Sequence, residues 1–147
     1  MLVHQATVED VDRIAALFDG YRQFYGKAPD LSAARSFLLD RFKNYQSVIF
    51  LAHTEAGDAT GFTQLFPSFS SVSMARTFIL NDLFVAPEAR RRGVAAMLLG
   101  SAAQYARSVG AIRITLTTAI DNQTAKALYL SEGWTQDEAF HVFHLGL

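Results

Sequence analysis

The stretch LFVAPEARRRGVAAMLL, residues 83–99, places three consecutive arginines between two apolar runs. The chain as a whole carries a net charge of −1, so the cluster does not follow from a basic composition. A run of like charges is most often a solvated face. Here a strand-like segment precedes the run and an amphipathic helix pattern follows it. The arginines therefore mark a turn from strand to helix, and the fold can be predicted outward from that turn.

The periodicity around this turn predicts one crossover unit. We expect a strand at 77–85, a helix at 93–109 and a further strand at 111–118. A connection that runs from strand to helix to strand joins parallel neighbours in a sheet. The two strands are therefore predicted to be parallel.

The other segments predict a mixed sheet of the α/β (α+β) class. Before the crossover we expect a strand at 2–7, a helix that starts after a capping box at Thr7 and runs to about Tyr25, and a second helix capped by Ser32. A hairpin of strands follows at 47–53 and 61–66, with a polar loop at 67–73. After the crossover we expect a short helix at 122–130 and a last strand at 140–145. A hairpin beside a crossover excludes a fully parallel sheet.

Length and composition limit the class of protein. A chain of 147 residues suits a single domain, 1–147. It contains no cysteine, which excludes disulfides, thiolate metal sites and a cysteine nucleophile. No signal peptide or long apolar run is apparent, so we expect a cytoplasmic protein without a membrane partner. The near-neutral charge with one basic cluster argues against nucleic-acid binding.

The turn at residues 90–93, called the arginine turn below, has the features of an anion-binding site. A helix N-terminus offers unpaired backbone N–H groups and a partial positive charge. Gly93, Ala95 and Ala96 leave the backbone accessible there, and the guanidinium groups add charge that suits a diphosphate. The alternative is a solvated loop. Neither G-x-x-x-x-G-K-S/T nor G-x-G-x-x-G occurs, so this is not one of the common nucleotide loops.

A second motif, NQTAKALYLSEGW, follows at residues 122–134 and helps to interpret the arginine turn. Together the two motifs resemble the GNAT superfamily of acyl-CoA-dependent N-acyltransferases, and the chain looks most similar to the small polyamine- and histone-type acetyltransferases. In that superfamily Q/R-x-x-G-x-G/A begins a helix and is followed by N-x-x-A-x-x-L/F-Y-x-x-x-G-F/W. The resemblance implies a mixed, splayed sheet flanked by helices, over nearly the whole chain.

The resemblance also implies a binding site for acetyl-CoA as co-substrate. The implied cofactor-binding residues are Leu83, Phe84, Val85, Arg90, Arg91, Arg92, Gly93, Val94, Ala95, Ala96, Asn122, Ala125 and Tyr129. In this scheme amides near Gly93 hold the pyrophosphate, and the backbone of Leu83 and Val85 pairs with the pantetheine arm. Tyr129 would sit at the sulfur and protonate the departing thiolate.

The acceptor side of the site is less determined by sequence. Asp82 is the candidate general base, with a carboxylate hydrogen-bonded to loop amides as the alternative. Tyr21, Phe24, Tyr25 and Asn81 are the candidate acceptor-binding residues, and the three aromatics could equally be core residues. The predicted activity is direct transfer of an acetyl group to a primary amine of a small molecule or of a lysine peptide. The alternative is a non-catalytic acyl-CoA sensor.

We predict no metal site. His141 and His144, three residues apart on the expected last strand, would point to opposite faces. His4 and His53 are each expected to stand alone. The apolar last strand would also suit a homodimer interface, with an ordinary strand of the sheet as the alternative.

Overall fold

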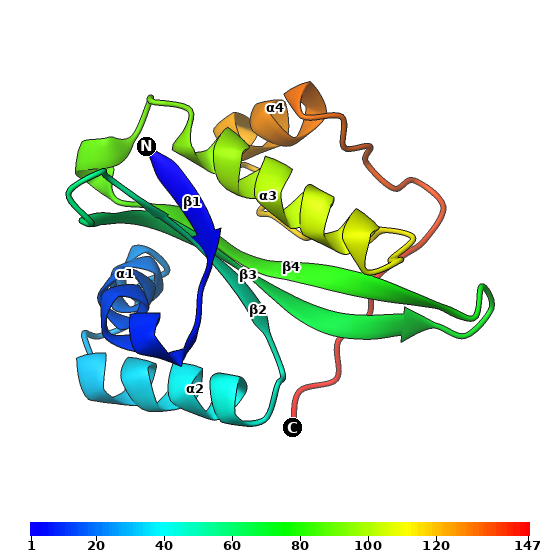
Figure 1. The fold of residues 1–147 in the computed structure, drawn as a ribbon. Coiled ribbons are helices and arrows are strands. Elements are labelled where there is room, and N and C mark those ends of the chain that lie inside the picture. The colour runs from blue at the N-terminus through cyan, green and yellow to red at the C-terminus, as the bar shows by residue number, and fades with distance from the viewer. The chain divides into compact units, whose positions relative to one another are not determined.

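The computed structural model describes residues Met1–Leu147 and divides into two compact units, Met1–Thr117 and Thr118–Leu147. The first unit contains a five-stranded sheet with strands in chain order (Figure 1). Its strands are β1 (Leu2–Gln5), β2 (Val48–His53), β3 (Ala59–Ser70), β4 (Ala75–Val85) and β5 (Ile114–Thr115). Its helices are α1 (Val11–Phe24), α2 (Leu31–Lys43) and α3 (Val94–Ser108), with short 3-10 turns η1 (Val8–Asp10) and η2 (Pro87–Ala89). The second unit contains α4 (Gln123–Ser131).

The sheet is mixed, as the sequence predicts. Strands β1 to β4 pair antiparallel in succession, and β5 joins β4 in parallel. The crossover from β4 through α3 to β5 therefore has the predicted direction. No helix is both long and apolar enough to cross a membrane.

Helices cover both faces of the sheet in the first unit (Figure 1). On one face, Phe62 of β3 packs edge-on against Phe18 and Tyr21 of α1. On the other face, Phe50 of β2 and Phe78 of β4 contact the ring of Tyr105 in α3. Alternate residues along a strand point to opposite faces, so each strand supplies apolar side chains to both layers.

The start of each N-terminal helix is fixed by an aspartate. The Asp10 carboxylate accepts a hydrogen bond from the Thr7 backbone N–H at 3.0 Å, as the capping-box pattern predicts. The second helix is capped by Asp30, which accepts from Ala33 N–H at 3.0 Å. The predicted cap at Ser32 is therefore wrong, because the helix has already begun at Leu31.

Two other boundaries differ from the sequence prediction. The first part of the segment 67–73 is strand rather than loop, because β3 continues to Ser70 and pairs there with Ala75 of β4. Pro67 is tolerated because β2 pairs with β3 only up to Leu65, so that part of β3 has one free edge. The strand expected at 111–118 is confined to Ile114 and Thr115.

The strand expected at 140–145 is absent, since that segment has no regular secondary structure. Its aromatic and β-branched residues favour a pleated surface, but a strand also requires a partner to receive its backbone hydrogen bonds. The sheet ends at β5 instead.

Candidate active site

A β-bulge in β4 determines where the candidate base points. Gln64 lies opposite Asp82 and Leu65 lies opposite Leu80, so Asn81 is an extra residue without a partner on β3. Strict alternation would place Asp82 on the same face as Phe78, toward α3. The bulge reverses the alternation, and Asp82 instead lies beside Gln64 on the face covered by α1.

Asp82 is buried and held by two side-chain amides. Gln64 Nε2 donates to Asp82 Oδ2 at 2.6 Å, and Asn81 Nδ2 donates to Oδ1 at 3.1 Å. Burial raises the pKa of Asp82 above its ordinary value, and hydrogen bonds from Gln64, Asn81 and Tyr21 offset only part of this effect. A carboxyl group with a raised pKa is a stronger base once ionised, which suits proton abstraction.

Gln64 is the site residue that sequence reasoning missed. Its side chain is fully buried, and because its Nε2 faces the carboxylate, its Oε1 is left without a hydrogen-bond partner. A buried acceptor without a donor is costly. Neighbouring Thr63 is also fully buried and donates through Oγ1 to the Asp82 carbonyl at 2.8 Å. The available signal was the polar pair Thr63–Gln64 inside the apolar strand GFTQLF.

Aromatic residues from the end of α1 lie beside this carboxylate. The Tyr21 ring contacts Phe62 and Phe84, and its hydroxyl donates to the Asn81 carbonyl at 3.4 Å. Burial and the nearby Asp82 charge raise the pKa of Tyr21, so its hydroxyl remains a donor. Phe24 and Tyr25 are 64% and 57% exposed, which excludes the core alternative for these two.

The far end of β4 has an open backbone edge. Strand β5 pairs with β4 only at Phe78 and Ile79, whereas β3 accompanies it to Val85. The edge that β5 leaves includes Leu83 and Val85, the residues predicted to pair with an extended ligand. The Phe84 ring points toward α1, because a side chain added at Gly20 would meet it at 3.6 Å. The Phe84 carbonyl lies close to Gly61 of β3, so its backbone is directed away from the open edge.

Beyond the strand, the arginine turn is fixed at Arg90 and strained at Arg91. Arg90 Nε donates to the Val85 carbonyl at 3.0 Å, and its guanidinium lies 5.7 Å from the centre of the Phe84 ring. Arg91 has a φ of 63°, which is uncommon for a residue with a side chain. Backbone strain of this kind is concentrated at functional sites.

The first turn of α3 follows without a cap. Gly93 has a φ of 76°, and no side chain caps the helix, whose first turn contains no acid. The amides of Val94, Ala95 and Ala96 donate no hydrogen bond, and a side chain added at Gly93 would enter open space. These donors, together with the exposed side chains of Arg91 and Arg92, form a cradle for an anion.

The second unit holds the other predicted residues. Asn122 caps α4, and its Oδ1 accepts from Ala125 N–H at 3.2 Å. This leaves the Asn122 Nδ2 as the group that can donate to a ligand. The Tyr129 ring lies 5.9 Å from that of Trp134, beyond the turn at Gly133. The predicted motif is thus a continuous local structure of helix, cap and turn.

Comparison with known proteins identifies the family. Residues 14–134 match the acetyltransferase (GNAT) family, and the chain belongs to it. It is 48% identical over 140 residues to YhfO of Bacillus subtilis, an uncharacterized N-acetyltransferase, covering 95% of this chain and 93% of that protein. It is 29% identical to a probable acetyltransferase of Haemophilus influenzae, covering 100% and 99% of the two chains.

Solved structures support the same fold. The crystal structure of a probable acetyltransferase is 44% identical, covers 100% of this chain and 98% of its own, and superposes with a TM-score of 0.95. A ribosomal-protein-alanine N-acetyltransferase from Brucella melitensis superposes with a TM-score of 0.80 at 16% identity, covering 99% and 100% of the two chains. The latter shows likeness of fold alone.

Proposed function

We propose that this acetyltransferase uses acetyl-CoA to acetylate a primary amine of a small molecule or of a lysine peptide, within one domain, 1–147. The observation that supports this most is the construction of β4. One strand carries a buried carboxylate at a bulge and an open backbone edge, and it leads directly into the arginine turn. The family match spans both compact units, which favours one domain.

The residues present fit coenzyme A. Its pyrophosphate needs clustered N–H donors and positive charge, which the start of α3 and the arginine turn offer. Its pantetheine arm carries amides that can pair with the open edge of β4 as an added strand would. Acetyl-CoA supplies a thioester whose carbonyl is already reactive toward amines.

The chain's own residues then move two protons. Asp82 accepts the proton that the amine nitrogen loses, while the side-chain amide of Gln64 holds the carboxylate in place. Tyr129 donates its phenolic proton to the departing sulfur and is then reprotonated from solvent. Asp82 later returns its proton to solvent, with the hydroxyl of Tyr21 as a neighbouring donor and acceptor.

The first test is binding and turnover with the native protein. Coenzyme A should raise the melting temperature by mass action, and adenosine should raise it much less because it lacks the diphosphate. Thiol release from acetyl-CoA should be stimulated by at least one member of a panel of polyamines, amino acids, aminoglycosides and lysine peptides.

Two outcomes would contradict the proposal in different ways. Equal stabilisation by adenosine and coenzyme A would remove the diphosphate site from the start of α3. Tight coenzyme A binding without thiol release for any amine in the panel would indicate the acyl-CoA sensor instead.

A further inference from the structure

Two of the four histidines meet at the outer edge of the sheet. Leu2 of β1 lies opposite His53 of β2, so His4 lies diagonally across from His53 on the same face. The ring centroids are 5.0 Å apart and the planes are inclined at 66°. The expectation that His4 and His53 each stand alone is therefore wrong, because strand pairing joins residues that are distant in the sequence.

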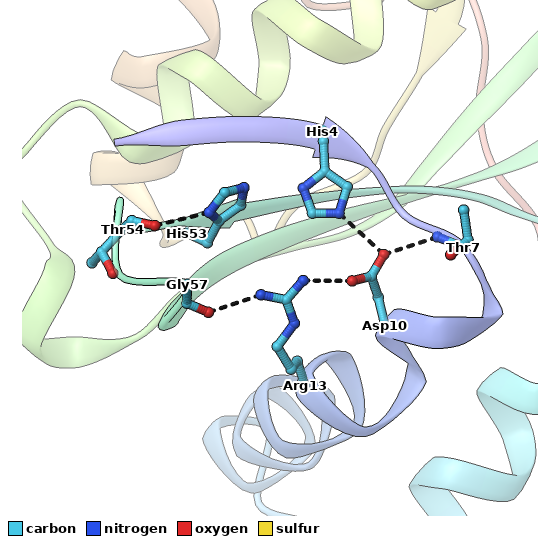
Figure 2. Close-up of polar contacts among 7 residues, drawn as sticks. All are labelled: His4, Thr7, Asp10, Arg13, His53, Thr54 and Gly57. Carbon is cyan, nitrogen blue, oxygen red and sulfur yellow. Dashed lines mark hydrogen bonds and ion pairs between the residues drawn. The ribbon is translucent and has the colours of Figure 1, made fainter.

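In each ring, the nitrogen on the side away from the other histidine (the outer nitrogen) hydrogen-bonds to an acceptor and therefore carries a proton. His4 Nε2 lies 3.0 Å from Asp10 Oδ2 (Figure 2). Asp10 Oδ2 also accepts from the Thr7 N–H, and Oδ1 accepts from the Arg13 guanidinium. Both oxygens of the carboxylate therefore act as acceptors, so His4 Nε2 donates. His53 Nδ1 likewise donates to the Thr54 carbonyl at 2.9 Å.

In the tautomer that each outer hydrogen bond selects, the inner nitrogen carries the lone pair. The two inner nitrogens are Nδ1 of His4 and Nε2 of His53, and Figure 2 shows them on the sides of the rings that face each other. Two facing lone pairs repel unless a cation lies between them. Imidazole nitrogens are common ligands of Zn²⁺, Ni²⁺ and Cu²⁺, whereas Mg²⁺ and Ca²⁺ prefer oxygen.

The ring separation fits a shared metal ion. A zinc–nitrogen bond of about 2.0–2.1 Å places each ring centroid roughly 3.2 Å from the metal, so two rings at a tetrahedral angle have centroids about 5.2 Å apart. The observed separation is 5.0 Å. Ligating histidines also typically donate their other N–H to a carboxylate or a backbone carbonyl, as His4 and His53 do.

We propose that His4 and His53 bind one divalent transition-metal ion of the Zn²⁺ type, with water completing the coordination. The charges around it are Asp10, which favours a cation, and Arg13, which opposes it. The Arg13 guanidinium is already engaged by the Asp10 carboxylate and by the Gly57 carbonyl (Figure 2). The ion joins β1 to β2 and lies apart from β4, so it is a structural staple rather than part of the transfer chemistry.

The test is zinc binding to the full chain, freed of metal with a chelator and titrated with ZnCl₂ in a calorimeter. We expect one Zn²⁺ per chain and a rise in melting temperature with Zn²⁺ by mass action. The variants His4→Gln and His53→Gln should each lose the site. Asp10→Asn removes the charge behind His4 and should weaken binding by about 10- to 100-fold.

The remaining two histidines provide matched controls. His141→Gln and His144→Gln should bind Zn²⁺ as the native chain does, since neither contributes a ligand. Native-like affinity in both His4→Gln and His53→Gln, or no Zn²⁺ uptake by the native chain, would overturn the proposal.

An NMR measurement on the native chain tests the same proposal if a variant does not fold. Histidine ¹⁵N resonances, recorded with and without ZnCl₂, should move at Nδ1 of His4 and Nε2 of His53. Movement confined to His141 and His144 would equally overturn it.

Discussion

At the scale of single residues, the buried carboxylate of Asp82 lowers the stability of the fold and is also the proposed general base. An ionisable side chain buried beside Gln64 and Tyr21 is expensive in its charged form, and this raises its pKa in the folded state. The folded chain therefore holds the Asp82 proton more tightly than the unfolded chain does. The stability that follows is present at acid pH and is lost as the pH rises through the folded-state pKa.

The substitution Asp82→Asn separates these two effects. If Asp82 is the base, turnover should fall by roughly 10²- to 10⁴-fold, and the acid limb of the pH–rate profile should disappear. Since the amide carries no charge to desolvate, the melting temperature at pH 7 should rise, with a gain that shrinks toward acid pH. The measurements are steady-state thiol release and thermal melts across the pH range.

A surface variant serves as the control for Asp82→Asn. Asp12 pairs with Arg35 on the exposed side of α1, so Asp12→Asn should alter neither property noticeably. Native-like turnover of Asp82→Asn at every pH would show that the carboxylate is held for structural reasons only.

At the scale of elements, the start of α3 is the feature most open to experiment. Its glycine adopts a left-handed conformation beside amides that lack acceptors. A β-branched side chain at Gly93 would add strain of about 1–2 kcal/mol and would project into the space assigned to the diphosphate. Gly93→Val should therefore destabilise the fold modestly and abolish coenzyme A binding in calorimetry.

Another glycine of the same helix gives a matched comparison. Gly100 lies in mid-helix with open space around its Cα. Gly100→Ala should stabilise the chain by about 0.5–1 kcal/mol without changing coenzyme A affinity. Retained affinity in a folded Gly93→Val protein would argue against the pyrophosphate assignment.

Elements with strong local signals were predictable from sequence, and those that depend on distant partners were not. The periodicity of α3 and the capping box before α1 act through residues close in the chain. The bulge at Asn81, the Gln64–Asp82 pair and the His4–His53 contact all depend on strand register. The absent strand at 140–145 shows the same limit, because suitable side chains do not supply a pairing partner.

At the scale of the whole molecule, the residues assigned to the chemistry are distributed along most of the chain. The base and the anion cradle belong to Met1–Thr117, and Tyr129 belongs to Thr118–Leu147. If Tyr129 protonates the leaving sulfur, Tyr129→Phe should lower kcat by around 10²-fold, because coenzyme thiols are fair leaving groups even without an acid. Acetyl-CoA affinity should change by about 1 kcal/mol at most.

Thiol release and calorimetry together distinguish the possible roles of Tyr129. The exposed Tyr45 provides a tyrosine control, and Tyr45→Phe should have native kcat and native affinity. Unchanged kcat in Tyr129→Phe would remove the phenol from the mechanism. Lost binding with unchanged kcat would make Tyr129 a cofactor contact only.

The bulge in β4 also changes what kinds of mutation this strand can tolerate. Deleting Asn81 would remove the extra residue and leave an unbroken ladder in which Asp82 still lies opposite Gln64 and Leu80 opposite Leu65. Asp82 and Phe84 would therefore still face α1, and the deletion would cost Asp82 only the hydrogen bond from Asn81. A residue inserted between Asp82 and Leu83 would instead turn Leu83, Phe84 and Val85 to the opposite layer. Related chains should therefore tolerate a change of length at Asn81 better than one after Asp82.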